Sequence, residues 1–216
     1  LGSINFEEKP WFMKKQNQKI ILGIGRPRCG ILTIDEKYNI SHIRTDGNSP
    51  VNMGIKTNKR FLLGHSDGTI TEINDSSRKY IQCGNDSITA ISSTDISWQA
   101  GDKNGNLFSS DGWSKKLGDR INCIVETKHH IWVSVTSKNN VVYLLDKGDG
   151  SIKHQFSHNY KIQLMKLSDN NLAISDEEGK IMFFDTKTLD KRIGTKSEIS
   201  EDFERRNLLK KRLRAL

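Results

Sequence analysis

Three neighbouring residues, His65, Ser66 and Asp67, are of the types found in nucleophilic triads. In such a triad a base activates a hydroxyl group, and a carboxylate orients the base. Side chains that follow one another along a strand and a turn point in different directions, so they rarely converge on one substrate atom. An Asp-Gly turn accounts for Asp67 and Gly68 without any chemistry. We therefore interpret this stretch as structural.

A second set of acidic and imidazole side chains, Asp95, Glu126 and His129, would need to meet at the centre of the molecule to act as acids and bases. Their positions in the sequence do not indicate such an arrangement. We expect no catalytic residue, and we expect that the protein is not an enzyme.

Histidines are frequent metal ligands, and four of them lie in the second half of the chain. His129 and His130 are adjacent, whereas His154 and His158 come later in the sequence. A metal site would require them to converge with one another or with a carboxylate. In the fold derived below, the first two belong to an inner turn and His154 to an outer strand, so we expect no metal site.

The three cysteines, Cys29, Cys83 and Cys123, have no short paired spacing, so they indicate neither a zinc site nor a disulfide framework. An odd number of scattered cysteines is typical of a reducing compartment. No apolar stretch is long enough for a transmembrane helix, and no signal segment opens the chain. We expect a cytoplasmic or nuclear protein. Gly23 and Gly25 are not followed by a helical pattern, so no dinucleotide site and no cofactor are expected.

A repeated hairpin sets the elements that position these residues. Residues 61–74 contain two apolar runs around a Ser-Asp-Gly turn, which predicts two antiparallel strands. Related segments are residues 20–34, 98–107, 131–145 and 172–184. Their turn positions, where a positive φ is expected, are Gly30, Gly68, Gly105, Asn140 and Gly179. These positions are 38, 37, 35 and 39 residues apart.

Two further predicted strands flank each hairpin. The apolar strands before the hairpins are residues 51–56, 88–92, 121–126 and 162–167. The more polar strands after the hairpins are residues 40–45, 78–83, 113–117, 151–156 and 191–195. Four strands per unit, with almost no helical periodicity, are typical of propeller blades. A β-sandwich is the alternative, but five regularly spaced hairpins favour an all-β propeller of four-stranded blades.

The tryptophans fit this interpretation. Trp11 lies in an apolar group that predicts the innermost strand of the first blade, with an exposed anchor for a partner as the alternative. Trp98 and Trp132 fall on second strands, where side chains pack between neighbouring blades. Trp113 begins an outer strand and is expected to be more exposed, near Lys115 and Lys116. This single cluster is only weak support for base stacking.

Residues 60–75 and 170–188 resemble the second and third strands of WD40-type blades. In that family the third strand ends in Trp-Asp, and this chain has the weaker pairs Phe184-Asp185, Leu145-Asp146 and Ile34-Asp35. The family's Gly-His pair near the start of a blade is missing. Gly64-His65 lies within a hairpin, so the structural role of the family's histidine is not transferred to His65. The resemblance covers about residues 11–195 and implies a propeller that binds proteins or peptides.

Five blades are recognisable, whereas WD40-like rings most often have seven. The chain is therefore a five-bladed ring, a fragment, or a ring that a partner completes. We expect a closed or nearly closed ring. The predicted organisation is a lead-in at residues 1–10, a propeller at residues 11–197 and a basic amphipathic helix at residues 198–216.

The chain carries a net charge of +8, and residues 201–216 contribute six basic and three acidic side chains to it. Ser200 is a suitable N-cap for a helix there, followed by acidic residues and then by basic ones. The helix either packs on the propeller, leads to a further domain, docks on a partner or a membrane surface, or contacts nucleic acid. Its candidate contact residues are Arg205, Arg206, Lys210, Lys211, Arg212 and Arg214.

The expected function is a non-enzymatic protein-interaction scaffold within an intracellular multiprotein complex. The alternative is a subunit of an RNA- or DNA-handling assembly that holds phosphate through its basic surface and tail. Other protein subunits are the expected partners, nucleic acid is the alternative partner, and membrane contact is not expected. Partner contacts are expected on the face that carries the hairpin turns and the connections between blades. The candidate residues there are Arg26, Arg28, His65, Asp67, Lys103, Lys138, Glu177 and Glu178.

Overall fold

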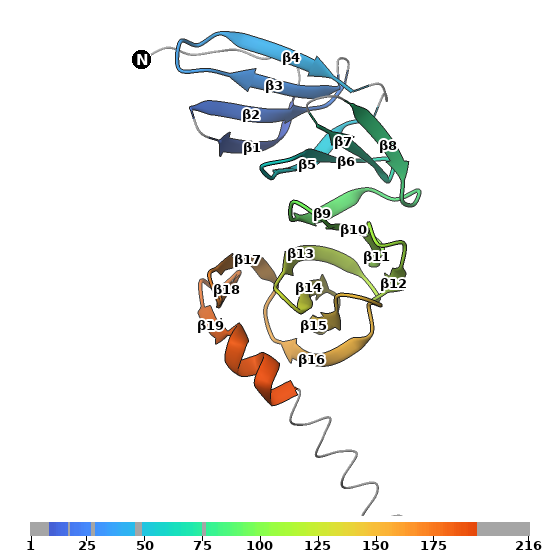
Figure 1. The fold of residues 1–216 in the computed structure, drawn as a ribbon, viewed down its shortest axis with the longest axis vertical. Helices are drawn as coiled ribbons and strands as arrows, with labels where there is room; N and C mark the ends of the chain where they lie inside the picture. Colours follow the sequence, from blue (N-terminus) through green and yellow to red (C-terminus); the bar gives the residue numbers. More distant parts are fainter. Residues whose placement is uncertain (1–8, 17, 27–28, 46–48, 75–76, 194–216) are drawn as a thin grey trace, which may run out of the picture.

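The computed structural model describes residues 9–16, 18–26, 29–45, 49–74 and 77–193. These residues form nineteen strands and one helix, whose described part covers residues 186–193. The strands build five antiparallel sheets that follow one another along an arc (Figure 1). We call these sheets blades 1 to 5, in chain order.

Within each blade the strands lie in chain order from the centre of the arc to its outside. The inner strands are β1 (Pro10–Gln16), β5 (Val51–Lys56), β9 (Ile88–Ser93), β13 (Arg120–Glu126) and β17 (Ile162–Ser168). The second strands are β2 (Lys19–Ile24), β6 (Phe61–His65), β10 (Trp98–Asp102), β14 (His130–Thr136) and β18 (Asn171–Asp176). The third strands are β3 (Gly30–Ile34), β7 (Thr69–Ile73), β11 (Asn106–Ser109), β15 (Asn140–Asp146) and β19 (Ile181–Asp185). The outer strands of blades 1 to 4 are β4 (Ile40–Arg44), β8 (Arg78–Gln82), β12 (Ser114–Lys116) and β16 (Ile152–His158).

The predicted turn glycines have the expected backbone conformation. Their φ angles are 138° at Gly30, 82° at Gly68, 85° at Gly105 and 81° at Gly179. The prediction for Asn140 is wrong, because this residue begins β15 and is not among the described residues with positive φ. In blade 4 the chain reverses just before it, where Ser137 Oγ donates to the carbonyl oxygen of Asn139 at 2.7 Å.

Apolar side chains pack between successive blades and do not form one central core. Trp98 packs with Leu62 and Ile70 between blades 2 and 3, and Trp132 packs with Leu172 between blades 4 and 5. Both tryptophans are buried, as predicted. The inner strands β1, β5, β9, β13 and β17 pack successively against one another along the arc. This radial arrangement is a β-propeller, and the predicted fold class is confirmed.

The arc is not closed, so the expectation of a closed or nearly closed ring is wrong for the described part of the chain. No packing comparable to that between successive blades joins β17 to β1 (Figure 1). Each end of the arc consequently exposes apolar side chains. Blade 1 exposes Trp11 and Met13 by 52% and 73%, and blade 5 exposes Leu164 and Phe183 by 57% and 74%.

Blade 5 also differs from its prediction. It has three strands, and the segment expected as its outer strand, residues 191–195, begins in the helix at residues 186–193. Asp185 caps this helix, since its carboxylate accepts the backbone N–H of Lys187 at 3.0 Å and the hydroxyl of Thr188 at 2.7 Å. His130 Nδ1 contacts Asp190 Oδ1 at 2.8 Å and ties the helix to blade 4. The predicted basic helix at residues 198–216 lies outside the described residues.

Candidate interaction surface

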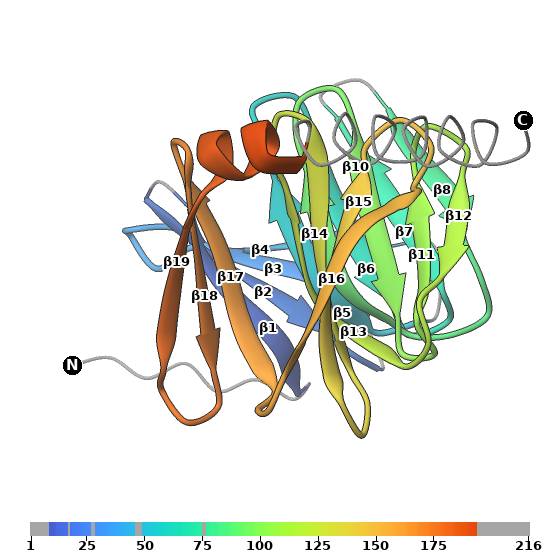
Figure 2. The ribbon, with the colours of Figure 1, turned by 90° about the horizontal axis from the view of Figure 1, so that it is seen from below.

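The propeller has two faces formed by turns. The helix and the turns between first and second strands lie on one face, and the β18–β19 turn projects from the opposite one (Figure 2). We call this opposite face the loop face, because it carries the turns between second and third strands and the connections between blades. The predicted contact residues outside the C-terminal tail that lie within the described ranges belong to it.

The structure places most of these residues at the surface. The exposed ones, one or two on each blade, are Arg26, Asp67, Lys103, Lys138, Glu177 and Glu178. Arg28 and the tail residues Arg205, Arg206, Lys210, Lys211, Arg212 and Arg214 lie outside the described residues. Arg26 and Asp67 line one depression of about 360 Å³, which Ser49, Pro50 and Ser66 complete. We call it the Arg26–Asp67 depression.

Asp67 is held firmly at the rim of this depression. Its backbone N–H donates to Ser49 Oγ at 3.1 Å, and its carboxylate accepts the backbone N–H of Thr69 at 3.1 Å. Partial burial works to raise the pKa of Asp67, but the hydrogen bonds from Thr69 and the nearby His65 outweigh it and lower the pKa. The depression is therefore lined by the fixed carboxylate of Asp67 and by the basic residue Arg26.

His65 is a predicted contact residue, but the structure buries it. It is only 2% exposed, and its ring contacts Thr71 Oγ1 at 2.7 Å and the carbonyl oxygen of Ser49 at 3.3 Å. Burial lowers the pKa of His65, and its two contacts hold β6, β7 and the connection from blade 1 together.

The remaining contact residues lie in turns between second and third strands, and two of them contact the connection that precedes their blade. Lys103 Nζ lies 3.2 Å from Asp86 Oδ1, which joins the turn of blade 3 to the connection that precedes it. Glu177 Oε1 accepts the backbone N–H of Lys161 at 3.0 Å in the same way in blade 5. Because the acidic residues Asp67, Glu177 and Glu178 lie among the basic ones, the described contact residues form no continuous basic track for a phosphate backbone.

Sequence reasoning missed a buried pair between blades 4 and 5. His158, the last residue of β16, contacts Asp176 Oδ2 at the end of β18 through Nε2 at 2.8 Å. This hydrogen bond is the main cause that lowers the pKa of Asp176. The sequence does contain a signal for this pair, namely an aspartate at the end of a second strand and a histidine a few residues before the first strand of the same blade. The search for adjacent Gly-His passed over it.

The residues considered for catalysis have structural contacts. Glu126 is buried, pairs with Lys147 Nζ and accepts the hydroxyl of Ser97 at 2.8 Å. Asp95 accepts the backbone N–H of Asn58 at 3.1 Å. Both side chains thus tie neighbouring blades together on the helix side. Within the described ranges, no three His, Cys, Asp or Glu side chains gather in a way that could hold a metal ion.

Trp113 is half-buried and packs against the core between blades 3 and 4. Its indole N–H donates to the carbonyl oxygen of Lys147 at 3.3 Å. This tryptophan is therefore part of the packing between blades.

The helix in the described residues lacks the length and apolar character needed to cross a membrane.

No family model matches the sequence, and no curated protein sequence is significantly similar to it. Solved structures do match its fold. The designed Ika8 protein matches with a TM-score of 0.68 at 12% identity, over 82% of this chain and 58% of Ika8. A chain of the Mitotic Checkpoint Complex matches with a TM-score of 0.65 at 12% identity, over 79% of this chain and 58% of that one.

Hsv2 from Kluyvelomyces marxianus is a further match, with a TM-score of 0.61 at 14% identity, over 80% of this chain and 61% of Hsv2. This chain therefore spans between 58% and 61% of these three structures. At such identities the likeness concerns the fold alone.

Proposed function

We propose that this chain is a non-enzymatic scaffold that binds other proteins through its loop face as a subunit of an intracellular complex. The observation that carries the proposal is the Arg26–Asp67 depression. There Arg26 and Asp67, whose backbone N–H is held by Ser49, line one depression at the junction of blades 1 and 2.

Such a pair suits a protein segment that carries both charges. Arg26 provides the planar, multiply donating group that binds carboxylates well, and Asp67 accepts hydrogen bonds from lysine, arginine or backbone N–H groups. The phosphate groups of a nucleic-acid backbone would be repelled by the carboxylates of Asp67, Glu177 and Glu178. The charge pattern therefore supports a protein ligand more than a nucleic acid.

The rigidity of the blades supports the same function. Turns held by hydrogen bonds at Asp67, Asp102 and Asp176 present their side chains without a large entropic cost on binding. Chemistry is not needed for this role. It requires only a defined surface.

The test is affinity purification of the full tagged chain from its native cells, with and without nuclease, followed by mass spectrometry. Arg26→Glu reverses one charge, and Asp67→Asn removes the other while it keeps a turn-forming residue. We expect each change to weaken partner binding by about tenfold, as for a contact near the centre of an interface. The matched control is Lys79→Glu on the exposed outer strand β8, which should leave binding unchanged.

Partners that disappear after nuclease treatment would favour the nucleic-acid alternative. Unchanged binding in both depression variants would refute the assignment of the loop face.

A further inference from the structure

The outer edge of blade 5 differs from those of the other blades because no described strand pairs with β19 on that side. The hydrogen bonds from Asp176 N to Lys180 O at 3.1 Å and from Thr186 N to Asn170 O at 2.8 Å fix the register of β18 and β19. Since antiparallel pairs alternate, the backbone groups of Met182 and Phe184 face β18, and those of Ile181 and Phe183 face outward. The edge thus offers a row of outward-facing donors and acceptors.

The four true outer strands are protected against such pairing by charge. β4, β8, β12 and β16 each carry at least one lysine or arginine, which is how natural sheets guard an exposed edge. β19 has four consecutive apolar residues, Ile181 to Phe184, and no charge before Asp185. Its sequence is that of an interior strand, which needs a partner on both sides.

An apolar groove lies beside this edge. It has a volume of about 540 Å³ and is bounded by Trp132, Leu144 and Phe156 of blade 4 and by Leu189 and Ile193 of the helix. Phe184 of β19 forms its inner wall, with ring centres 5.5 Å from Trp132 and 6.0 Å from Phe156. We call it the blade 4–5 groove.

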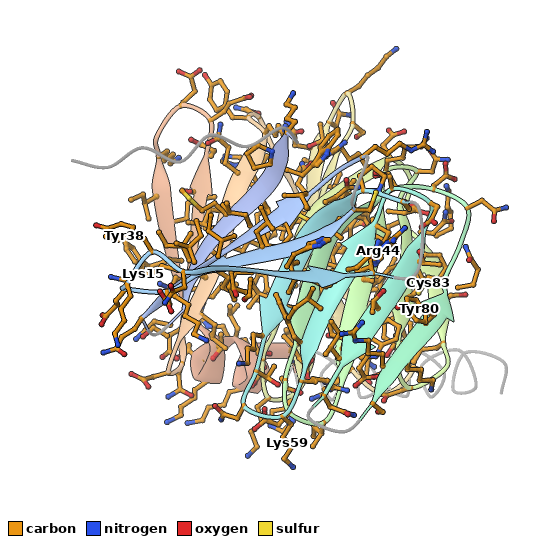
Figure 3. The ribbon with its side chains drawn as sticks, turned by 90° about the horizontal axis from the view of Figure 1, so that it is seen from above. Lys15, Tyr38, Arg44, Lys59, Tyr80 and Cys83 are labelled. Carbon is orange, nitrogen blue, oxygen red and sulfur yellow. The ribbon has the colours of Figure 1, made fainter. Side chains whose placement is uncertain are left out.

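The boundary between blades 1 and 2 shows what normally fills this position. There the outer strands β4 and β8 both exist, and Arg78 of β8 donates to the carbonyl oxygen of Arg44 at 3.1 Å. Figure 3 shows Arg44 of blade 1 near Tyr80 and Cys83 of blade 2, at the opposite end of the view from Lys15 and Tyr38. Between blades 4 and 5 no strand equivalent to β8 is present among the described residues. The blade 4–5 groove lies beside the edge that such a strand would cover.

We infer that the outer edge of β19 and the blade 4–5 groove bind an extended segment of a partner protein, which completes blade 5 as its fourth strand. The segment runs antiparallel to β19, as each outer strand does to its third strand in blades 1 to 4. Its main chain pairs with Ile181 and Phe183, and alternate apolar side chains enter the groove.

The charge around the groove defines the segment further. Its charged or ionisable lining residues are Lys153, His154 and Arg192, and no acidic residue lines it among the described residues. Lys153 also contacts Asp146 at 3.3 Å, outside the groove. A segment with acidic residues next to its apolar ones therefore fits best. A second copy of β19 would bring its own Lys180 and Lys187 to this basic rim, so like charges would meet.

This inference shares with the proposed function only the requirement for a protein partner, and it uses a different surface. It is tested by incorporating the photo-crosslinker p-benzoylphenylalanine into the full chain in its native cells. The crosslinker replaces His154, which faces the groove, or in the control Gln155, the next residue on the opposite side of β16. Crosslinked peptides are then sequenced by mass spectrometry.

We expect the His154 position to crosslink to one segment of another protein, with apolar and acidic residues, and the Gln155 position not to do so. Crosslinks to a second copy of this chain or to its own residues would overturn the inference. So would the absence of any crosslink while partners still bind the loop face, a result that leaves the proposed function intact. Loss of every partner would refute both.

Main-chain pairing is tested separately with Phe183→Pro, which removes an outward N–H and leaves the hydrogen bonds to β18 in place. We expect the crosslinking yield at His154 to fall by about tenfold. Phe183→Ile, which keeps the N–H, serves as the matched variant. Thermal melting of both variants shows whether the fold is retained, and an unchanged yield in a folded proline variant would refute strand addition.

Discussion

Blades 4 and 5 have similar third strands and very different endings. β15 ends in Leu145-Asp146 and β19 in Phe184-Asp185, and each aspartate accepts the backbone N–H of the residue two positions later. After Asp146 come Gly148 and Gly150, with a φ of 69° at Gly150, and the chain turns back into β16. After Asp185 no glycine follows before Gly194, and the chain continues as a helix.

The comparison shows that the residues after the aspartate decide whether a blade is completed. A capping carboxylate suits both a tight turn and a helix start. A glycine with positive φ selects the turn, and helix-compatible residues with Leu189 and Ile193 four positions apart select the helix. Blade 4 consequently has a fourth strand, whereas blade 5 has three strands among the described residues.

The largest difference is expected in the cores of the two blades. Leu145 and Leu172 are both fully buried, but Leu145 lies between two complete blades and Leu172 in a blade with one free face. Leu145→Ala should cost about 4 kcal/mol and Leu172→Ala about 2 to 3 kcal/mol, because the looser site can collapse around the cavity. Urea unfolding of both variants measures the difference. A greater cost for Leu172→Ala would contradict the view that blade 5 is less constrained.

The second comparison concerns a glycine in each blade. At Gly150 an added Cβ would lie 2.7 Å from the Trp113 ring, whereas at Gly179 nothing lies within 4 Å. Both glycines have positive φ, so we expect Gly179→Ala to cost about 1 kcal/mol and Gly150→Ala about 2 to 3 kcal/mol. Equal shifts in thermal unfolding would mean that backbone strain alone sets the cost.

The third comparison tests the two aspartates. Asp185→Ala removes the cap of the helix and should lower stability by about 1 kcal/mol, together with the helical signal in circular dichroism. Asp146→Ala should leave the helical signal unchanged, because its turn also keeps the hydrogen bond from Gly150 N to the Asp146 carbonyl oxygen at 3.1 Å. Asp185→Ser keeps a capping oxygen and serves as the control. Loss of helical signal in that control would show that capping is not the cause.

The smallest effect is a pH dependence of the contact between the two blades. The hydrogen bond from His158 favours the Asp176 carboxylate in the folded state and lowers its pKa from 3.8. The stabilisation from this hydrogen bond is therefore complete at pH values above the pKa of Asp176 in the unfolded chain. It is lost as the pH falls below about 4. Acid unfolding of the wild type and of Asp176→Asn should show that the difference between their free energies of unfolding becomes smaller below this pH. A difference that stays constant with pH would exclude titration of Asp176 as the cause.

The repeat could be predicted from the sequence because each unit contains the apolar runs and the turn residues of its own hairpin. Apolar runs around Gly30, Gly68, Gly105 and Gly179 predicted the second and third strands, and burial of Trp98 and Trp132 followed from their place on those strands. The helix at residues 186–193 was missed because its signals are short. They consist of one capping aspartate and two apolar residues, which also fit a turn and an outer strand.

The contact surface was less predictable than the fold. Arg26 and Asp67 were identified separately, since both lie in turns, but their proximity depends on how blade 1 meets blade 2. The burial of His65 depends on a hydrogen bond to Ser49, sixteen positions earlier in the chain. Closure of the arc is a property of the whole set of blades, and no single repeat encodes it.

Because four apolar clusters lie between successive blades and the fifth lies within blade 1, this propeller behaves as a linear array of units coupled to their nearest neighbours. In such an array the terminal units open most readily, since each lacks one stabilising interface. Amide hydrogen exchange should accordingly be fastest in blades 1 and 5 and slowest in the middle. A strand that docks on β19 would act as a terminal cap, and part of its binding energy would appear as slower exchange in blade 4.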